Sequence, residues 1–362
     1  MVWCLFRHSA AQLVRDIAVR TGSRIVVQKV SFAVLETLLK KIGVKVSTKF
    51  LGRVALRAIP AIGAVGNGAY SFYDTTEVGG IVPLAAPLQI PVVIPQATAN
   101  SFVGYSPFVF RCVYSDRQQA EALAGYLWYW RKVRRIGLAV NMDPDDEYSR
   151  NIARDVAQCF NDLGGEVVRT IEIRGTEYGS AMQDLLTRGP QAVLLPFEGK
   201  TAAAMLKTLR DKGYEGIVCG PDSWDSTEFF SALSDRRDIG DCVYIGMFGA
   251  DEEYAPFREF SKRFRERNFH TPGSTETLSY DAMRMLAVGL GRAETIMDFE
   301  HNWRSMKKYP AASGVLSTLP KGAVDSTIYI NSISAGTYLD PHPHPRTIRS
   351  FLHSTLESYR ND

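Results

Sequence analysis

From residue 90 onward, the sequence alternates short apolar segments with longer amphipathic segments. The apolar segments have the length of buried strands, and the segments between them carry apolar residues at helical spacing. This alternation predicts a parallel sheet with helices on both faces, in an open, doubly wound α/β domain. The expected strands are 90–95, 134–141, 165–173, 192–197, 216–220 and 242–249. The expected helices are 117–129, 148–163, 180–186, 201–212, 226–233, 255–267 and 275–292.

The C-terminal part has a different pattern. Residues 313–339 combine β-branched and aromatic residues with turn residues, which predicts strands joined by turns. Residues 340–362 predict a tail with a short, solvent-facing helix.

The charge is distributed unevenly along the chain. Residues 1–78 contain eleven Lys and Arg against four Asp and Glu, whereas the whole chain has a net charge of only +3. The remainder is therefore slightly acidic. A basic N-terminal segment on an acidic body predicts that only this segment meets an acidic partner, either anionic lipid or nucleic acid.

The N-terminal segment predicts helices over 10–58, because its apolar residues recur at helical spacing with Lys and Arg between them. Two stretches, LLKKIGVKVSTKF (38–50) and RAIPAIGAVGNGAYSFYDTTEVG (57–79), resemble the C-terminal part of the EcsC family. The resemblance implies an all-α segment over 10–79, and it implies little about mechanism because the role of that family is poorly defined.

Five stretches of the remaining chain match another family in order and spacing. They are IPVVIPQAT (90–98), YSPFVFRCVYSDRQQAEALAGYL (105–127), LAVNMDPDDEYSRNIARDVAQCFNDLGGEVV (138–168), GTEYGSAMQDLL (175–186) and LSYDAMRML (278–286). Together they resemble the branched-chain amino-acid (Leu/Ile/Val) receptors of ABC transporters, which have the type I periplasmic-binding-protein fold. The resemblance extends over about 83–339.

The resemblance implies two lobes, each with a doubly wound sheet. The expected second lobe, about 131–250, is whole. The expected first lobe, 83–130 with 255–339, lacks about half of its sheet, because the EcsC-like helices stand where the family has its first βα units. The predicted domains are therefore 1–78, 79–345 and a tail at 346–362, and the incomplete lobe predicts weak amino-acid affinity.

The family binds a free amino acid or a similar small polar ligand between its lobes, so the site must accept hydrogen bonds from an ammonium group and donate them to a carboxylate. Thr98 falls on the first-lobe loop position; the alternative is a turn or cap threonine. Tyr148 falls on the position of the family's tyrosine at the start of the second-lobe helix, where the ring could line the ligand site. The alternative is a partly buried surface tyrosine.

Asp222, in the sequence GPDSW, matches the acidic residue that binds the ammonium group. It follows a predicted strand at its C-terminal end, where open α/β sheets bind ligands. The alternative is an N-cap of the next helix, a position that Asp favours. Ser223 beside it and Glu198, in PFEGK, complete the expected ligand set, although the family often has an aromatic residue at the latter position.

No catalytic grouping is recognisable, since the six histidines are scattered and no Ser-His-Asp or Cys-His pattern appears. No cofactor or metal is expected. The two histidines of PHPHP (341–345) lack further ligands, and the acidic turn 143–147 lacks the glycine and terminal Glu of a calcium loop. WYWRKVRR (128–135) spans a helix end and a strand start, so nucleic acid is not favoured as a partner there.

The five cysteines include no CxxC pair, and their odd number favours buried thiols over a disulfide framework. Charged residues interrupt the first twenty residues, so these do not have the pattern of a signal peptide. The chain as written is expected to be cytoplasmic or peripheral at a membrane. A start further upstream would place it in the periplasm, as in the parent family.

These observations predict a solute-binding protein without catalysis, whose partners are an amino acid or analogue and the membrane subunits of an ABC transporter. The alternative is an EcsC-like protein that acts at a membrane surface through residues 1–78, with the receptor-like part as a degenerate scaffold. An enzyme on the same α/β framework is the third possibility, and the missing catalytic grouping argues against it.

Overall fold

The computed structural model describes residues 78–79, 82–83, 91–144, 146–234, 239–249, 253–291, 293, 295–333 and 346–356. The predicted EcsC-like helices therefore lie almost wholly outside the described residues. The chain divides into two compact units. Unit 1 comprises Met1–Tyr114 and Glu252–Ser326, and unit 2 comprises Ser115–Asp251 and Thr327–Asp362.

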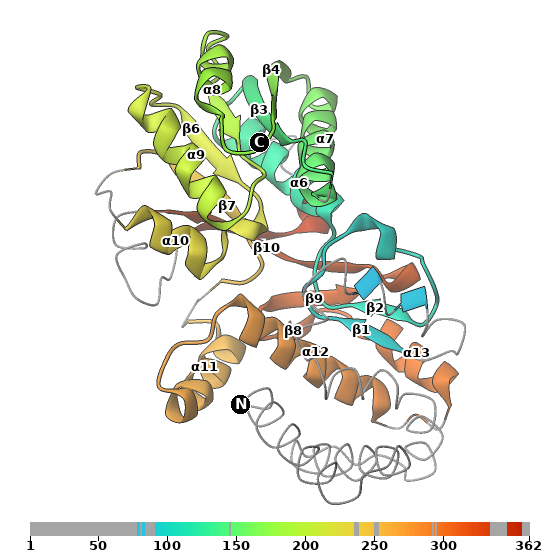
Figure 1. Ribbon diagram of the computed structural model, residues 1–362. Coiled ribbons are helices and arrows are strands. Elements are labelled where there is room, and N and C mark those ends of the chain that lie inside the picture. The colour runs from blue at the N-terminus through green and yellow to red at the C-terminus, as the bar shows by residue number, and fades with distance from the viewer. Residues whose placement is uncertain are drawn as a thin grey trace, which may run out of the picture. The chain divides into compact units, whose positions relative to one another are not determined.

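Unit 2 contains most of a mixed sheet with the strand order β4-β3-β5-β6-β7-β10, and β11 pairs with β10 (Figure 1). The first five of these strands are parallel to one another, and β10 and β11 are antiparallel additions. Their bounds are β3 Arg135–Asn141, β4 Glu166–Ile173, β5 Ala192–Leu194, β6 Ile217–Gly220, β7 Cys242–Gly246, β10 Val324–Ser332 and β11 Arg346–Leu352.

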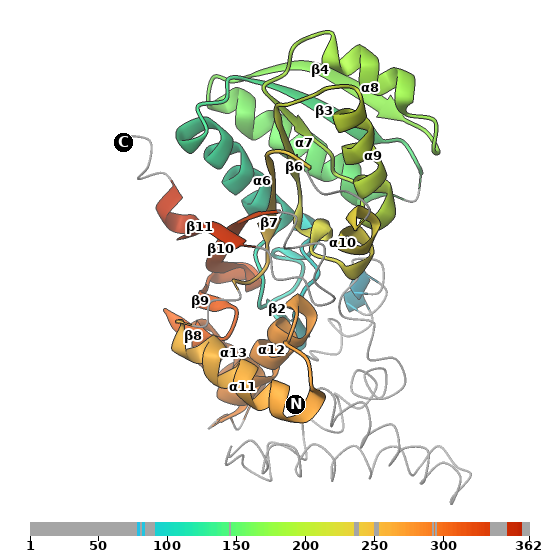
Figure 2. The ribbon, with the colours of Figure 1, turned by 90° about the vertical axis from the view of Figure 1, so that its left-hand side faces the viewer.

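Helices cover both faces of this sheet, as the alternation in the sequence predicts (Figures 1 and 2). On one face, α8, α9 and α10 form a continuous apolar core with the strands, around Met182, Leu206 and Phe229. On the other face, α6 and α7 pack against each other. The bounds are α6 Asp116–Gly125, which continues as a π-helical turn to Trp130, α7 Glu147–Asp162, α8 Gly179–Leu186, α9 Gly199–Asp211 and α10 Thr227–Leu233.

Local sequence explains where the helices of unit 2 begin. Ser115 and Gln118 form a capping box at α6, the side chain of Asp146 accepts the Ser149 N–H at α7, and Ser226 accepts the Phe229 N–H at α10. These contacts satisfy N–H groups that the first turn of a helix leaves without partners. The helix predicted at 117–129 is found as α6 and belongs to unit 2, where it packs on α7.

Among its described residues, unit 1 contains a two-stranded parallel sheet of β1 and β2, a hairpin of β8 and β9 that pairs with the start of β10, and the helices α11, α12 and α13. A cluster of apolar side chains that includes Phe110, Met285, Phe299 and Trp303 forms its core. The bounds are β1 Val92–Ile94, β2 Val109–Arg111, α11 Ala255–Asn268, α12 Ser274–Leu290, α13 Ile296–Arg304, β8 Tyr309–Ala311 and β9 Gly314–Thr318.

A buried carboxylate anchors the β8–β9 hairpin to α12. Asp281 has no exposed surface, and its two oxygens accept the backbone N–H groups of Ala312 at 2.6 Å and Ser313 at 2.7 Å. Burial raises the pKa of Asp281 to about 6, although the contacts with Ser313 and Ala312 and the charge of Arg284 lower it. The aspartate of the YDA stretch therefore fixes a turn within unit 1.

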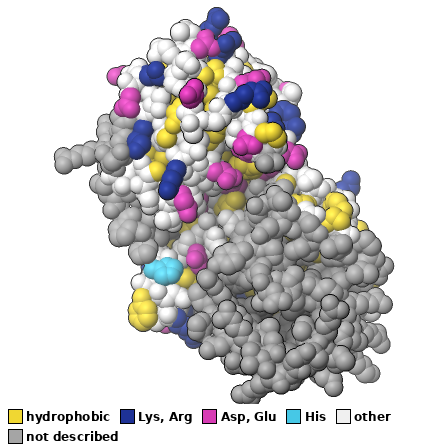
Figure 3. All heavy atoms as spheres, viewed as in Figure 1, with side chains coloured by type: hydrophobic (Ala, Val, Ile, Leu, Met, Phe, Trp, Pro, Cys, Tyr) yellow, Lys and Arg dark blue, Asp and Glu magenta, His cyan; other side chains and the backbone are white. Residues whose placement is uncertain are grey.

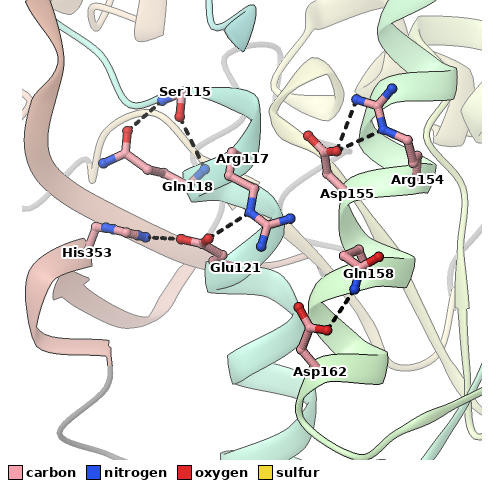
Figure 4. A network of polar contacts seen from close by, with 9 residues as sticks. All are labelled: Ser115, Arg117, Gln118, Glu121, Arg154, Asp155, Gln158, Asp162 and His353. Carbon is pink, nitrogen blue, oxygen red and sulfur yellow. Dashed lines mark hydrogen bonds and ion pairs between the residues drawn. The ribbon is translucent and has the colours of Figure 1, made fainter. Parts of the chain in front are cut away.

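The C-terminal tail contains a strand that was not predicted from the sequence, followed by a short helix. Residues 346–352 form β11, an antiparallel strand on β10, and residues 353–356 form a short, partly exposed 3-10 helix in the tail where a short helix was expected. Phe351 is buried and stacks on Trp130, with ring centroids 5.6 Å apart. The adjoining His353 lies 2.6 Å from Glu121 of α6, which also accepts a hydrogen bond from Arg117 (Figure 4). The strand was not predicted because these partners lie far away in sequence and supply the stabilisation that local propensity does not.

Candidate ligand-binding site

The candidate site lies at the carboxyl ends of the parallel strands of unit 2. β6 ends at Gly220, and Pro221 leads directly into a 3-10 turn, Asp222–Trp224. A side chain at position 220 would overlap the Trp224 indole, so glycine allows the turn to fold back over the strand end. Trp224 is fully buried and donates its indole N–H to Leu195 O at 3.2 Å, so its side chain is part of the core.

The turn places the Asp222 carboxylate against two helices. Tyr148, in the first turn of α7, donates its hydroxyl to Asp222 Oδ1 at 2.5 Å. Gln119 of α6 donates from Nε2 to Asp222 Oδ2 at 3.2 Å, and its Oε1 accepts the Asp222 backbone N–H at 3.3 Å. Asp222 is 5% exposed. The side chain therefore does not cap a helix; it is held at the centre of a buried polar cluster.

The charges around Asp222 are unbalanced. Burial, together with the neighbouring carboxylates Asp116 and Asp225, raises the pKa of Asp222 to about 7, against the lowering effect of the hydrogen bonds from Tyr148 and Gln119. Burial and the charges of Asp222 and Asp116 hold the pKa of Tyr148 well above its ordinary value, so this hydroxyl stays protonated. Within the described part of the chain, Asp222 forms no ion pair, and both of its side-chain donors are neutral. A buried carboxylate in this state is stabilised by an incoming cation.

Two more of the residues expected from the sequence lie at this edge. Ser223 is half-buried and donates its hydroxyl to Phe197 O at 3.4 Å, beside the cluster. Glu198 is exposed at the start of α9, and its side chain does not cap that helix. Tyr148, Asp222 and Ser223 are therefore brought together, while Glu198 points to solvent from the same side of the sheet.

Thr98 belongs to unit 1, where it is 5% exposed in the loop after β1. The peptide groups on either side of it are held by a buried cation: Arg111 of β2 donates from Nη2 to Ala97 O at 3.2 Å and to Ala99 O. Gln96 of the same loop accepts a hydrogen bond from Thr275 at the start of α12, at 3.3 Å. The Thr98 loop is thus fixed by β2 and α12.

Gln119 and Asp116 were not among the residues predicted for the site. They lie three apart on α6, so their side chains share one face of the helix, and Gln119 Nε2 donates to Asp116 Oδ1 at 3.2 Å. Both side chains are buried. The signal was present in the D..Q part of the stretch SDRQQA, which carried the family resemblance without an assigned role.

Among the described residues, no group of His, Cys, Asp and Glu has the arrangement of a metal site, and no helix is long and apolar enough to cross a membrane. Residues 341–345 lie outside this range. Cys112, Cys159, Cys219 and Cys242 are buried free thiols, as predicted. On the face of unit 2 seen in Figure 3, basic and acidic side chains are interspersed.

The three arginines of the segment 128–135 are engaged within the protein. Arg131 pairs with Asp241, Arg134 lies over the Trp128 ring at 3.7 Å, and Arg135 donates to Arg188 O at 2.7 Å.

The model of the periplasmic binding protein family matches residues 69–337, so the chain belongs to this family. Among curated proteins, it is similar to Leu/Ile/Val-binding protein homolog 6 of Brucella melitensis, with 26% identity over 148 residues, which is 39% of this chain and 36% of that protein. The chain therefore spans little more than a third of the length of the curated relatives it matches.

Solved structures agree on the fold. A branched-chain amino-acid transporter substrate-binding protein, LivJ, of Streptococcus pneumoniae in complex with isoleucine aligns with a TM-score of 0.65 and 17% identity, over 83% of this chain and 84% of that chain. A branched-chain amino-acid ABC transporter ligand-binding protein of Burkholderia xenovorans aligns with a TM-score of 0.72 and 14% identity, over 91% of each chain. The predicted family and the predicted type I periplasmic-binding-protein fold are confirmed.

Proposed function

We propose that this chain is a solute-binding receptor that takes up a small ligand with a protonated amine, such as an amino acid, and that Asp222 binds the ammonium group. The observation that carries the proposal is a buried carboxylate whose side-chain donors are both neutral and whose neighbours are also carboxylates. The ligand's ammonium group would supply the missing positive charge. The proposal involves binding alone, without catalysis, as in the relatives, whose names describe binding proteins.

The other residues of the site take roles that follow from their positions. Tyr148 and Ser223 would line the ammonium end, with the Tyr148 ring beside the ligand. Thr98, in the loop held by Arg111, would donate its hydroxyl to the ligand carboxylate, and Glu198 would lie at the solvent-facing side.

The ligand test compares three molecules that share one aliphatic group: leucine, isoamylamine, which lacks the carboxylate, and 4-methylpentanoate, which lacks the amine. Ligand-observed NMR on the full chain suits this comparison because it detects weak binding. We expect leucine and isoamylamine to bind, and Asp222→Asn to weaken both by about 2–5 kcal/mol, since a desolvated charge pair loses one partner. Preferential binding of 4-methylpentanoate, or equal affinities in wild type and Asp222→Asn, would overturn the proposal.

We propose the membrane subunits of an ABC transporter as the protein partner, because the Burkholderia protein is described as the ligand-binding protein of an ABC transporter and the Streptococcus protein as a transporter substrate-binding protein. The family name favours the periplasm as the location. Cell fractionation tests the location, and affinity capture with the membrane subunits of an ABC transporter tests the partner.

For residues 1–78, binding to an anionic membrane surface is a proposal that rests on their basic composition. Co-sedimentation of the full chain with phosphatidylserine vesicles should occur at low salt and decrease as salt rises. Absence of binding at low salt would exclude it, and retention of nucleic acid would identify the other class of partner.

A further inference from the structure

The Gln119 side chain joins two buried carboxylates. An amide nitrogen carries two hydrogens, and Gln119 Nε2 donates to Asp116 Oδ1 and to Asp222 Oδ2, each at 3.2 Å. Gln119 Oε1 accepts the backbone N–H of Asp222 at 3.3 Å. Gln119 is 1% exposed, so water does not compete for these contacts. All the hydrogen-bonding groups of this side chain therefore serve the cluster.

These contacts fix the orientation of the amide. In the flipped orientation, Gln119 Oε1 would face both carboxylates, and Nε2 would face the backbone N–H of Asp222. Both exchanges replace a favourable contact by a repulsive one. Gln119 consequently presents its positive end to Asp116 and Asp222 and lets the two carboxylates share a buried environment.

The arrangement leaves acceptor positions on the Asp222 carboxylate unused. Each carboxylate oxygen has two lone-pair sites; Oδ1 accepts from Tyr148 and Oδ2 from Gln119, so each oxygen can accept one more hydrogen bond. Because the present donors are neutral, they orient the carboxylate without cancelling its charge. A neutral or anionic ligand group placed there would leave that charge uncompensated.

We propose that Gln119 is a positioning residue that makes the site selective for ligands with a protonated amine, by holding Asp222 oriented and ionised beside Asp116. This inference rests on the proposed function of Asp222 and adds the determinant of its selectivity. Without the amide, Asp222 would more readily take up a proton. The affinity for ligands with an amine would then fall relative to the affinity for ligands without one.

A purely structural role for Gln119, as a tie between α6 and the turn 222–224, makes a different prediction. Loss of the tie would weaken all ligands together and would leave the ratio of their affinities unchanged. Gln118 provides a matched control, because it is the neighbouring glutamine on α6 and accepts the Ser115 N–H at 2.8 Å in the capping box. Gln118→Met thus removes a hydrogen bond of the same helix that does not involve Asp222.

The experiment uses the full chain as wild type, Gln119→Met, Gln119→Glu and Gln118→Met. Two quantities are measured: the ratio of the affinities for isoamylamine and 4-methylpentanoate, and the titration of the Asp222 carboxyl by carbon-13 NMR without ligand. We expect Gln119→Met to lower the ratio roughly tenfold or more, as for loss of a hydrogen bond to a charged group, and to move the titration of Asp222 to higher pH. Gln119→Glu, which lacks the amide donors at the same size, should change both quantities in the same direction, and Gln118→Met should change neither.

An unchanged ratio together with an unchanged Asp222 titration in both Gln119 variants would overturn the proposal, as would equal effects of Gln118→Met. If wild type binds none of the three ligands, the proposed function fails. The ligand-free titration then still decides whether Gln119 controls the charge of Asp222.

Discussion

Each unit buries an aspartate with a raised pKa, and the two aspartates are held in different ways. In unit 1, Asp281 accepts two backbone N–H groups of a hairpin turn, from Ala312 and Ser313. In unit 2, Asp222 accepts side-chain donors from two helices, Tyr148 and Gln119. The pKa of Asp281 is raised to about 6 and that of Asp222 to about 7, mainly by burial in both cases.

The difference indicates what each carboxylate does. Backbone donors are set by the fold, so Asp281 stabilises the chain that folds around it. Side-chain donors that converge on the end of a strand leave acceptor sites open, and the further charges near Asp222 are carboxylates, whereas Arg284 lies near Asp281. Asp281 has the environment of a structural anchor, and the environment of Asp222 supports the proposal that it binds the ammonium group of a ligand.

The largest effect is expected from removal of the anchor. Asp281→Ala should lower the free energy of unfolding by about 2–5 kcal/mol, because two buried backbone N–H groups lose their acceptors. Urea denaturation measures the loss, and protease digestion should show cleavage first within unit 1. Glu259→Ala, which removes an exposed i,i+4 pair with Arg263 in the same unit, should change stability by less than about 0.5 kcal/mol. A comparable loss in both variants would contradict the role given to Asp281.

Substitution by asparagine should change the free energy of unfolding in opposite directions at Asp222 and Asp281. The raised pKa of Asp222, about 7 against an ordinary 3.8, means that the folded state binds a proton more tightly than the unfolded state. Stability therefore falls as pH rises between these two values, and Asp222→Asn removes that dependence. At pH about 8, Asp222→Asn should be more stable than wild type by about 2–4 kcal/mol, and the difference should vanish near pH 4.

Asp281→Asn should instead be less stable than wild type at both pH values, because its amide N–H₂ would face a backbone N–H. Thermal unfolding of the two variants at both pH values measures this contrast. If both asparagine variants change the stability in the same direction, the proposed difference between the roles of Asp281 and Asp222 is contradicted.

Ligand affinity should depend on pH through Asp222. The groups that face its carboxyl are Asp116 from α6, Tyr148 from α7 and Asp225 from its own turn, and among these the carboxylates keep its pKa high. Below pH about 7, Asp222 becomes protonated, so the affinity for isoamylamine should fall by up to roughly tenfold per pH unit. The affinity of Asp222→Asn should be flat over this range. Titrations followed by NMR at several pH values decide the point, and a flat wild-type profile would contradict it.

The sequence predicted the regular part of unit 2 well, because periodicity and capping are local. Tyr148 and Asp222 were found through motifs that lie beside strand ends. Gln119 was missed because Asp222 stands 103 positions away, so only the folded chain brings the two together. For the same reason the strand β11 was not predicted: Trp130 and β10, which hold it, are distant in sequence. Helix α13 was also missed, although the capping box of Thr295 and Asp298 was a local signal for it.

The smallest effect is expected from a substitution that tests whether backbone N–H groups or a side-chain hydroxyl hold Asp281. The Ser313 hydroxyl also contacts Asp281 and lowers its pKa. Ser313→Ala removes this contact but keeps the backbone N–H of residue 313, so it should destabilise the chain by at most about 1 kcal/mol. Tyr148→Phe is the counterpart at Asp222, where a side chain is the donor, and it should shift the titration of its aspartate to higher pH by more than Ser313→Ala does. Carbon-13 NMR of both carboxyl groups, with urea denaturation, measures these changes. If Ser313→Ala costs as much stability as Asp281→Ala, the hydroxyl rather than the backbone holds Asp281, and the two aspartates are supported in the same way.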